Sequence, residues 1–517
     1  MSTHIDSTVG LSRLIHNASA LQVFNAVVAL IIIRWFARGF YRAYFHPLAR
    51  FPGPKISAAT RIPQIVATWT GSSHLYVARL HRQYGPIVRI SPDHISFIDS
   101  QAWKDTSGHA TAEQKKQRGS MPTKHWSRYG RAVNGTPSLI NQQSDKEHAR
   151  MRRVFNPAFS DRALKQQEPL FMKWIDLLVS KLDEGIQEDS DRKWNMVRMY
   201  NFTTFDVMGD LTFGEPLNML NSGKYDPWVS MIFGSVRTNS KLSIIQYYPL
   251  LYKAFKALVP ETFAKKRYEH FQYSVERVTK RLERGRRSEG VDLWDLVLKQ
   301  DDGKVMSRAE MDSNSSLFMI AGTETTATLL SGLTYQLLKN PDKMEKLVEE
   351  IRSTFADSRD MHMEALAALP YLNACMKEAL RVYPPVPVGL PRMTPPDGST
   401  IAGVYVPPDT TVTIPHLAMY TSELNFKDPL SFVPERWLGD ERYANDDKHA
   451  LQPFSVGPRD CLGKNMAYHE MRLIAAKVFY KFDFELCPES DKWNDQEVFT
   501  LWEKHPLMCK LKPATSS

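Results

Sequence analysis

The chain has 517 residues, of which 43% are hydrophobic and 24% are charged. These values are ordinary for a globular protein and exclude a disordered, collagen-like or coiled-coil chain. The 66 Lys and Arg residues exceed the 57 Asp and Glu residues by nine, a basic balance that nucleic-acid binding would explain. However, residues 1–60 hold six basic residues and one acidic residue, all around one apolar stretch. This distribution indicates membrane topology, and we predict no nucleic-acid partner.

That apolar stretch is the first predicted element. Residues 18–36 are almost wholly apolar, and Arg34 and Arg38 mark their C-terminal end. A secretory signal peptide, the alternative, carries its positive charges before the apolar core. We therefore predict a lumenal N-terminus at residues 1–17, one transmembrane anchor at 18–36 and a cytosolic C-terminal side. Asn17 begins a glycosylation sequon, and the sequence does not decide whether it is used.

The remainder of the chain is predicted to form a hinge and one large domain. Residues 37–55 are basic and rich in proline, and Pro52 and Pro54 disfavour helix around Gly53. Residues 56–517 contain no repeat or low-complexity linker, so we predict one domain. Its sequence pattern is mainly helical with small β-sheets.

Two β-hairpins are expected within this domain. The first pairs residues 86–90 with 95–98, and the second pairs 401–406 with 411–414 around a Pro-Pro-Asp turn.

The longest predicted helix begins after Ser307. Ser307 and Glu310 form a capping-box pattern, and no proline follows until Pro341. At 1.5 Å per residue such a helix is about 50 Å long and must cross the domain. Its centre, residues 321–326, reads Ala-Gly-Thr-Glu-Thr-Thr, a poor helix-forming stretch at the place where packing matters most.

Cys461 stands out among the four cysteines. Residues 454–463, Phe-Ser-Val-Gly-Pro-Arg-Asp-Cys-Leu-Gly, bend tightly around it, and a helix pattern follows. A cysteine before a helix N-terminus has a stabilised thiolate, the form that ligates metals. The alternative, a buried structural cysteine, is our interpretation for the other three, Cys375, Cys487 and Cys509.

This loop resembles the haem-binding loop of cytochromes P450, F-x-x-G-x-R-x-C-x-G, through Phe454, Gly457, Arg459, Cys461 and Gly463. The resemblance implies the cytochrome P450 fold, preceded here by one N-terminal transmembrane helix. It implies haem b as cofactor and Cys461 as the axial ligand of the haem iron.

Two further patterns match structural and catalytic motifs of that family. Glu378 and Arg381 match E-x-x-R, a buried ion pair that Arg436 of the later Pro-Glu-Arg motif joins, and the implied role is structural. Glu324 and Thr325 match the acid–alcohol pair of A-G-x-[DE]-T, which the family uses to deliver protons during O2 activation. The alternative for Thr325 is a hydroxyl that bonds its own helix backbone.

A last set of residues is implied to bind the haem carboxylates: His148, Arg152, Arg392 and Arg459. The fork of donors on arginine suits carboxylates, and surface charge is the alternative interpretation.

The resemblance to membrane-anchored P450s implies a single-pass protein of the endoplasmic reticulum membrane with a cytosolic haem domain. Its electrons would come from NADPH through cytochrome P450 reductase, with cytochrome b5 as a further possible partner. Lys146, Arg150, Arg153 and Lys464 could receive such an acidic partner or be solvated charges.

The implied function is a monooxygenase that inserts one oxygen atom from O2 into a lipophilic small molecule. The amino-acid sequence of several segments is similar to that of P450s of filamentous-fungal secondary metabolism. Two alternatives remain open: a P450-fold isomerase or dehydratase that does not use O2, and a non-catalytic haem carrier or sensor.

Overall fold

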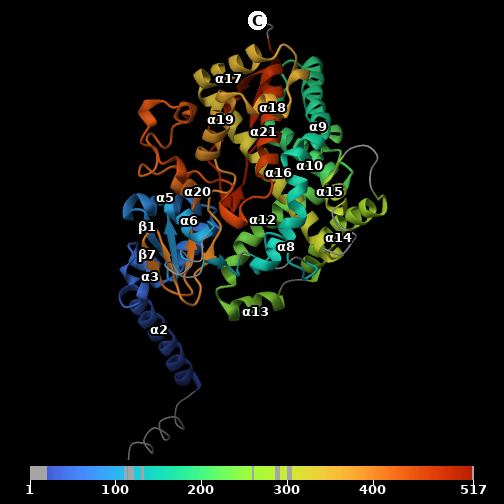
Figure 1. Ribbon diagram of the computed structural model, residues 1–517. Coiled ribbons are helices and arrows are strands. Elements are labelled where there is room, and N and C mark those ends of the chain that lie inside the picture. Colours follow the sequence, from blue (N-terminus) through green and yellow to red (C-terminus); the bar gives the residue numbers. More distant parts are fainter. Residues whose placement is uncertain are drawn as a thin grey trace, which may run out of the picture.

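The helix α16 (Arg308–Lys339) crosses the centre of the molecule (Figure 1). Its N-terminus carries the predicted capping box, because the Ser307 side chain accepts from the Glu310 N–H and the Glu310 side chain accepts from the Ser307 N–H. It ends at Lys339 with Asn340 as its C-cap, and Pro341 begins the next helix. The helix α10 (Met196–Phe213) packs along it, and every α10 residue except Arg198 is buried. These two helices form the centre of the core.

This computed structural model describes residues 20–109, 113, 121–127, 129, 133–258, 261–285, 291–299 and 306–514. The predicted lumenal segment 1–17, with Asn17, and the first two residues of the predicted anchor lie outside the described residues.

Other helices surround the central pair. Before α10 they are α2 (Ala20–Tyr44), α3 (Lys55–Ala59), α4 (Ile62–Trp69), α5 (Ser73–Tyr84), α6 (Gln101–Ser107), α8 (Asp145–Phe155) and α9 (Asp161–Glu188). Between α10 and α16 they are α11 (Met219–Ser222), α12 (Pro227–Ile245), α13 (Pro249–Leu258), α14 (Glu261–Glu283) and α15 (Leu293–Lys299). After α16 they are α17 (Pro341–Thr354), α18 (Met363–Ala367), α19 (Pro370–Val382), α20 (His416–Tyr420) and α21 (Lys464–Lys481).

Four small sheets complete the described fold. The largest has the strand order β1-β2-β8-β5-β3, and the others are β4-β12-β9, β6-β7 and β10-β11. The strands are β1 (Ile87–Ser91), β2 (His94–Phe97), β3 (Thr123–Lys124), β4 (Lys193–Asn195), β5 (Arg392–Met393), β6 (Ser399–Ile401), β7 (Val404–Val406), β8 (Thr411–Thr413), β9 (Phe482–Leu486), β10 (Val498–Phe499), β11 (Leu501–Trp502) and β12 (Met508–Pro513). The predicted class, mainly α with small β-sheets, is confirmed.

One predicted hairpin is correct and the other is wrong. β1 and β2 pair antiparallel as expected. The predicted strand 401–406, in contrast, lies within a hairpin of its own, in which β6 pairs with β7 across Ala402 and Gly403. Both turn residues have positive φ, +48° and +74°, as a tight two-residue turn requires. β8 instead joins the largest sheet, parallel to β2 and antiparallel to β5.

The helix α2 projects from the rest of the molecule (Figure 1). It is long and apolar enough to cross a membrane, with a mean hydropathy of 1.9 in its most apolar window and no buried residue there. It therefore fits a membrane anchor. The helix extends to Tyr44, beyond the predicted anchor end at residue 36.

The chain after α2 packs on the largest sheet. Leu48 is 1% exposed, and the buried guanidinium of Arg89 on β1 donates to the Arg42 carbonyl at 2.8 Å. A Cβ at Gly53 would lie 2.4 Å from the Arg89 carbonyl oxygen. These contacts tie the C-terminal end of α2 directly to the domain.

Candidate active site

A tight loop presents Cys461 three residues before α21. The loop includes the short 3-10 helix Gly457–Arg459, and the Cys461 N–H closes it by donating to the Phe454 carbonyl at 2.8 Å. Gly457 has a φ of +79°, and a Cβ there would lie 2.0 Å from the Ser107 carbonyl oxygen, so only glycine fits. Of the four cysteines, all within the described chain, only Cys461 is exposed.

Opposing influences act on the pKa of the Cys461 thiol when no iron is bound. Its pKa is raised from its ordinary value, first because the surrounding protein desolvates the thiolate. A hydrogen bond from the Gly463 backbone and the charges of Arg152 and Lys464 oppose this shift without overcoming it. Without iron, desolvation thus raises the pKa of Cys461 by more than the donors at the start of α21 lower it. Because a coordinated metal deprotonates a thiol, iron binding would supply the missing stabilisation.

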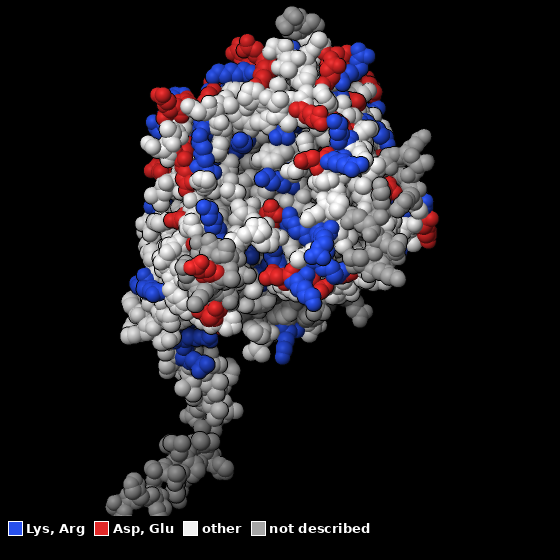
Figure 2. All heavy atoms as spheres, viewed as in Figure 1, with Lys and Arg blue, Asp and Glu red and all other residues white. Residues whose placement is uncertain are grey.

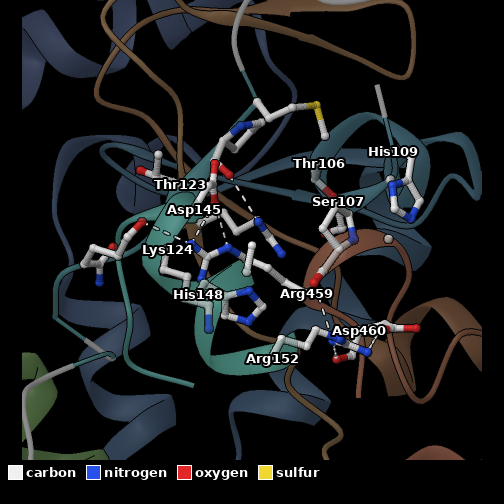
Figure 3. Close-up of a pocket in the computed structure, with 18 of the residues that line it drawn as sticks. Thr106, Ser107, His109, Thr123, Lys124, Asp145, His148, Arg152, Arg459 and Asp460 are labelled. Carbon is white, nitrogen blue, oxygen red and sulfur yellow. Dashed lines mark hydrogen bonds and ion pairs between the residues drawn. The ribbon is translucent and has the colours of Figure 1, made fainter. Parts of the chain in front are cut away.

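Basic side chains surround a cavity of about 800 Å³ next to this loop (Figure 3). The cavity brings together all four predicted carboxylate-binding residues, which come from distant parts of the chain: His148 and Arg152 of α8, Arg392 of β5 and Arg459 of the cysteine loop.

Lys124, which sequence reasoning missed, lines the same cavity. It lies directly opposite Arg392 in the β3–β5 pairing, and like charges in that position repel each other. β3 has only two residues, too few for any periodicity, and follows a stretch outside the described residues. The sequence therefore offered no pattern that could place this lysine.

The electrostatics of this basic cluster favour an anion. Burial, followed by the charges of Arg459, Lys124 and Arg152, lowers the pKa of His148 to about 3. Burial, followed by Arg459 and Arg392, lowers the pKa of Lys124 to about 7. Positive charges crowded this closely depress one another's protonation, and a bound anion would relieve that repulsion.

Two arginines of the cluster also hold the protein together. Arg459 donates to the Asp145 carboxylate at 2.7 and 2.9 Å and to the Gln142 carbonyl at 2.6 Å. Arg152 donates to the Asp460 carbonyl at 2.7 Å and to its carboxylate. These bonds fix the direction of each guanidinium along the cavity wall.

The centre of α16 holds the predicted acid–alcohol pair. Thr325 is half-buried, Ala321 one turn earlier is exposed, and the Thr325 hydroxyl donates to the Ala321 carbonyl at 2.7 Å. Accessible residues in the middle of a central helix indicate an internal space beside that face. Gly322, next to Ala321, faces α10, because a Cβ there would lie 2.9 Å from Met208 of that helix. It permits the close packing of α10 on α16.

Glu324 is buried and engaged with a residue that sequence reasoning also missed. The Lys504 ammonium donates to its Oε1 atom, and both side chains are almost inaccessible, at 3% and 7% exposure. Lys504 lies 180 residues further along the chain in an irregular segment after β11, so no local motif connects the two residues.

The three predicted structural residues meet in one buried network. Arg381 of α19 donates to both oxygens of Glu378, at 2.7 and 3.0 Å, and Arg436 donates to Glu378 Oε1 at 3.0 Å. The Trp437 indole N–H adds a bond to Glu378 Oε2 at 2.9 Å. All three charged side chains are fully inaccessible. The Glu378 carboxylate is therefore held from several sides.

Comparison with known proteins identifies the family. A model of the cytochrome P450 family matches residues 52–510. The cytochrome P450 monooxygenase efuB of Hormonema carpetanum is 47% identical, with 99% of both chains covered. The cytochrome P450 monooxygenase FUM2 of Gibberella moniliformis is 47% identical over 92% of this chain and 99% of its own. The cytochrome P450 monooxygenase lcsI of Purpureocillium lilacinum is 42% identical over 94% of this chain and 93% of its own.

The chain belongs to the cytochrome P450 family and is a monooxygenase, as the sequence predicted. Family membership implies a haem cofactor, electrons from a redox partner and a lipophilic substrate. The residues present fit haem, because a crowded basic cluster suited to carboxylates borders the loop that exposes a cysteine. The relatives do not favour an isomerase or a haem carrier.

Proposed function

We propose that Cys461 is the axial thiolate ligand of the iron of haem b. The observation that carries this proposal is that Cys461 is exposed while Cys375, Cys487 and Cys509 are packed in the protein. Its loop also lines the cavity that the basic side chains surround. A thiolate ligand donates electron density to the iron and favours O–O cleavage.

In the same proposal the basic cluster binds the two haem carboxylates. His148, Arg152, Arg392 and Arg459 are the assigned partners, and Lys124 joins them because it lines the same cavity. The lowered pKa values of His148 and Lys124 support this assignment, since two carboxylates would favour the protonated forms that burial, followed by the neighbouring positive charges, disfavours.

We assign oxygen activation to Glu324 and Thr325. Haem, when bound, supplies an iron that binds and activates O2. The Thr325 hydroxyl can hold a proton at the accessible face of α16, and the Glu324 carboxylate can pass protons to it from deeper in the protein. Glu378, Arg381 and Arg436 receive a structural role, that of stabilising the core that supports the cysteine loop.

We further propose NADPH–cytochrome P450 reductase as the electron donor, with cytochrome b5 as a second partner. Figure 2 shows Lys and Arg side chains gathered in the region of α8. Lys146, Arg153 and Lys464 are exposed there, whereas Arg150 is paired with Glu147 and Glu310 and is less available. Exposed positive charge on this face suits an acidic docking partner.

The membrane assignment is the endoplasmic reticulum with the haem domain in the cytosol. Our proposal divides the chain into a lumenal segment 1–17, an anchor 18–36, a hinge 37–55 and a haem domain 56–517. The apolar helix α2 and the arginines at its C-terminal end support this topology.

We propose a lipophilic fungal secondary metabolite as the substrate, and the fungal sources of the relatives support this. The test is reconstitution of the full chain with the reductase, NADPH and isotopically labelled O2, using extract of a strain that lacks the gene. We expect one labelled oxygen atom in a product. Label incorporated only into water, or a product formed without O2, would contradict the proposed reaction.

A further inference from the structure

The carboxylate of Glu324 on α16 is bound by Lys504, which comes from the C-terminal part of the chain. Lys504 donates to Glu324 Oε1 and to the Thr328 hydroxyl, the latter at 2.7 Å. Thr328 lies one helical turn after Glu324 and donates to the same Oε1 atom at 3.4 Å. One oxygen of the carboxylate is therefore fixed by two donors.

This ion pair is buried, which separates it from ordinary surface charge pairs. The Lys504 and Glu324 side chains are 3% and 7% exposed, so water screens their attraction only weakly. Within the described chain, no other Lys or Arg lies within ion-pair distance of Glu324. Without Lys504 the carboxylate would be a buried charge with no compensation, a state that proteins avoid by protonating the acid.

Two tyrosines among the described residues also feel the charge of Glu324. Burial, followed by a hydrogen bond with Asn201 that opposes it and by the charge of Glu324, leaves the pKa of Tyr225 raised from its usual value. Burial, followed by the charge of Glu324, raises the pKa of Tyr383 far above its usual range. Both phenols therefore stay neutral, and Lys504 is the group that compensates the Glu324 charge.

The second carboxylate oxygen is in a different situation. Glu324 Oε2 is buried and has no hydrogen-bond partner among the described residues. The Thr325 hydroxyl, next in sequence, donates to the Ala321 carbonyl at 2.7 Å. The acid and the alcohol thus hold different partners, and Oε2 is the atom of Glu324 that is open to accept a proton.

We propose that Lys504 is a positioning residue for proton delivery: it keeps Glu324 ionised and fixed through Oε1, so that Oε2 receives each proton destined for Thr325. This inference rests on the proposed role of Glu324 and Thr325. Lys504 itself touches neither the cofactor nor the substrate in this assignment.

Infrared spectroscopy tests the pairing without any turnover. We expect Lys504→Met to gain a protonated-carboxyl band at neutral pH that disappears at alkaline pH, because the unpaired Glu324 takes up a proton. This band adds to that of Glu470, which is protonated at neutral pH in wild type and in every variant, and the double variant Lys504→Met/Glu324→Gln lacks the added band. Identical carboxyl bands in wild type and Lys504→Met would overturn the proposal. If Lys504→Met does not fold, recovery of folding in the double variant supports the pairing, and failure to recover contradicts it.

Turnover with the reductase tests the consequence. We expect Lys504→Met to send a several-fold larger share of NADPH electrons to peroxide at neutral pH, with the excess falling at alkaline pH as Glu324 ionises. Lys504→Arg, which keeps the charge, should send a smaller share of electrons to peroxide than Lys504→Met.

Lys477→Met is the matched control, because Lys477 is also buried, at 4% exposure, but pairs with Asp176 of α9 instead of Glu324. An equal rise in peroxide in this control, or a rise that does not depend on pH, would overturn the positioning role. A wild-type protein that consumes no NADPH would count against the proposed function, and the infrared comparison would still decide the pairing.

Discussion

Arg152 of α8 donates to the backbone carbonyl of Asp460 at 2.7 Å and to its carboxylate, directly before Cys461 in the chain. This contact joins the basic cluster to the cysteine loop, so a single side chain both lines the cavity and holds the loop. The first prediction follows from this double role.

Arg152→Ala should weaken haem retention while the protein still folds. The variant loses charge-assisted hydrogen bonds worth about 1.5–3 kcal/mol each, and it removes one cation from the cavity. The measurement is the rate of haem transfer to an excess of apomyoglobin. Lys146→Ala, at an exposed position of the same helix that does not line the cavity, is the control and should release haem at the wild-type rate. Equal release rates for both variants would contradict this account.

Glu378→Gln should destabilise the fold by about 3–5 kcal/mol, because it leaves the buried Arg381 guanidinium without a carboxylate, whereas Arg436 keeps its pair with Asp446. We expect little haem-loaded protein, measured as haem absorbance per unit of purified chain. Asp357→Asn breaks an exposed pair with Arg359 and should leave the haem content unchanged. Normal haem content in Glu378→Gln would show that the network is dispensable.

Local patterns predicted those parts of the molecule that depend on neighbours in sequence. The capping box of Ser307 and Glu310, the β1–β2 hairpin and the glycine at 457 each follow from a few adjacent residues. The second hairpin failed because Ala402 adopts positive φ, which its residue type does not favour.

Long-range partners were predicted only where a family motif named them. Glu378 and Arg436 are 58 residues apart, and only the resemblance connected them. Lys124 and Lys504 belong to no such motif, and tertiary packing alone brings each to its site.

Thr325→Ala should keep substrate binding and divert reducing equivalents to peroxide, because the variant lacks the hydroxyl that holds a proton at the accessible face of α16. The ratio of peroxide formed to NADPH consumed measures this effect, and we expect a several-fold rise. Thr323→Ala is the matched control, since Thr323 makes the same type of bond to its own helix, to Met319 at 2.6 Å, but is fully buried. A Thr325→Ala enzyme that forms no more peroxide per NADPH than wild type would refute the role of the hydroxyl.

Glu470 should make the folded protein less stable as the pH rises. This residue of α21 is fully inaccessible, and burial raises its pKa from 4.5 to about 8, with only partial opposition from the Thr326 hydroxyl. Between these two pH values the folded state binds a proton that the unfolded state has lost, so the free energy of unfolding declines.

Glu470→Gln should remove that decline, as measured by the urea midpoint across this pH range. Glu364→Gln, at an exposed position of α18, should leave the decline in place. An unchanged pH slope in Glu470→Gln would mean that the carboxyl group is ionised in the folded protein.

The most direct test of the central claim, that Cys461 is the iron ligand, is the carbon monoxide spectrum of the reduced protein. The account predicts the strongly red-shifted Soret band of a thiolate-ligated haem in wild type and in Cys375→Ser, whose cysteine is buried in the core. It predicts loss of that band in Cys461→Ser. A freshly prepared wild-type protein without the shifted band, or a Cys461→Ser variant that keeps it, would contradict the assignment.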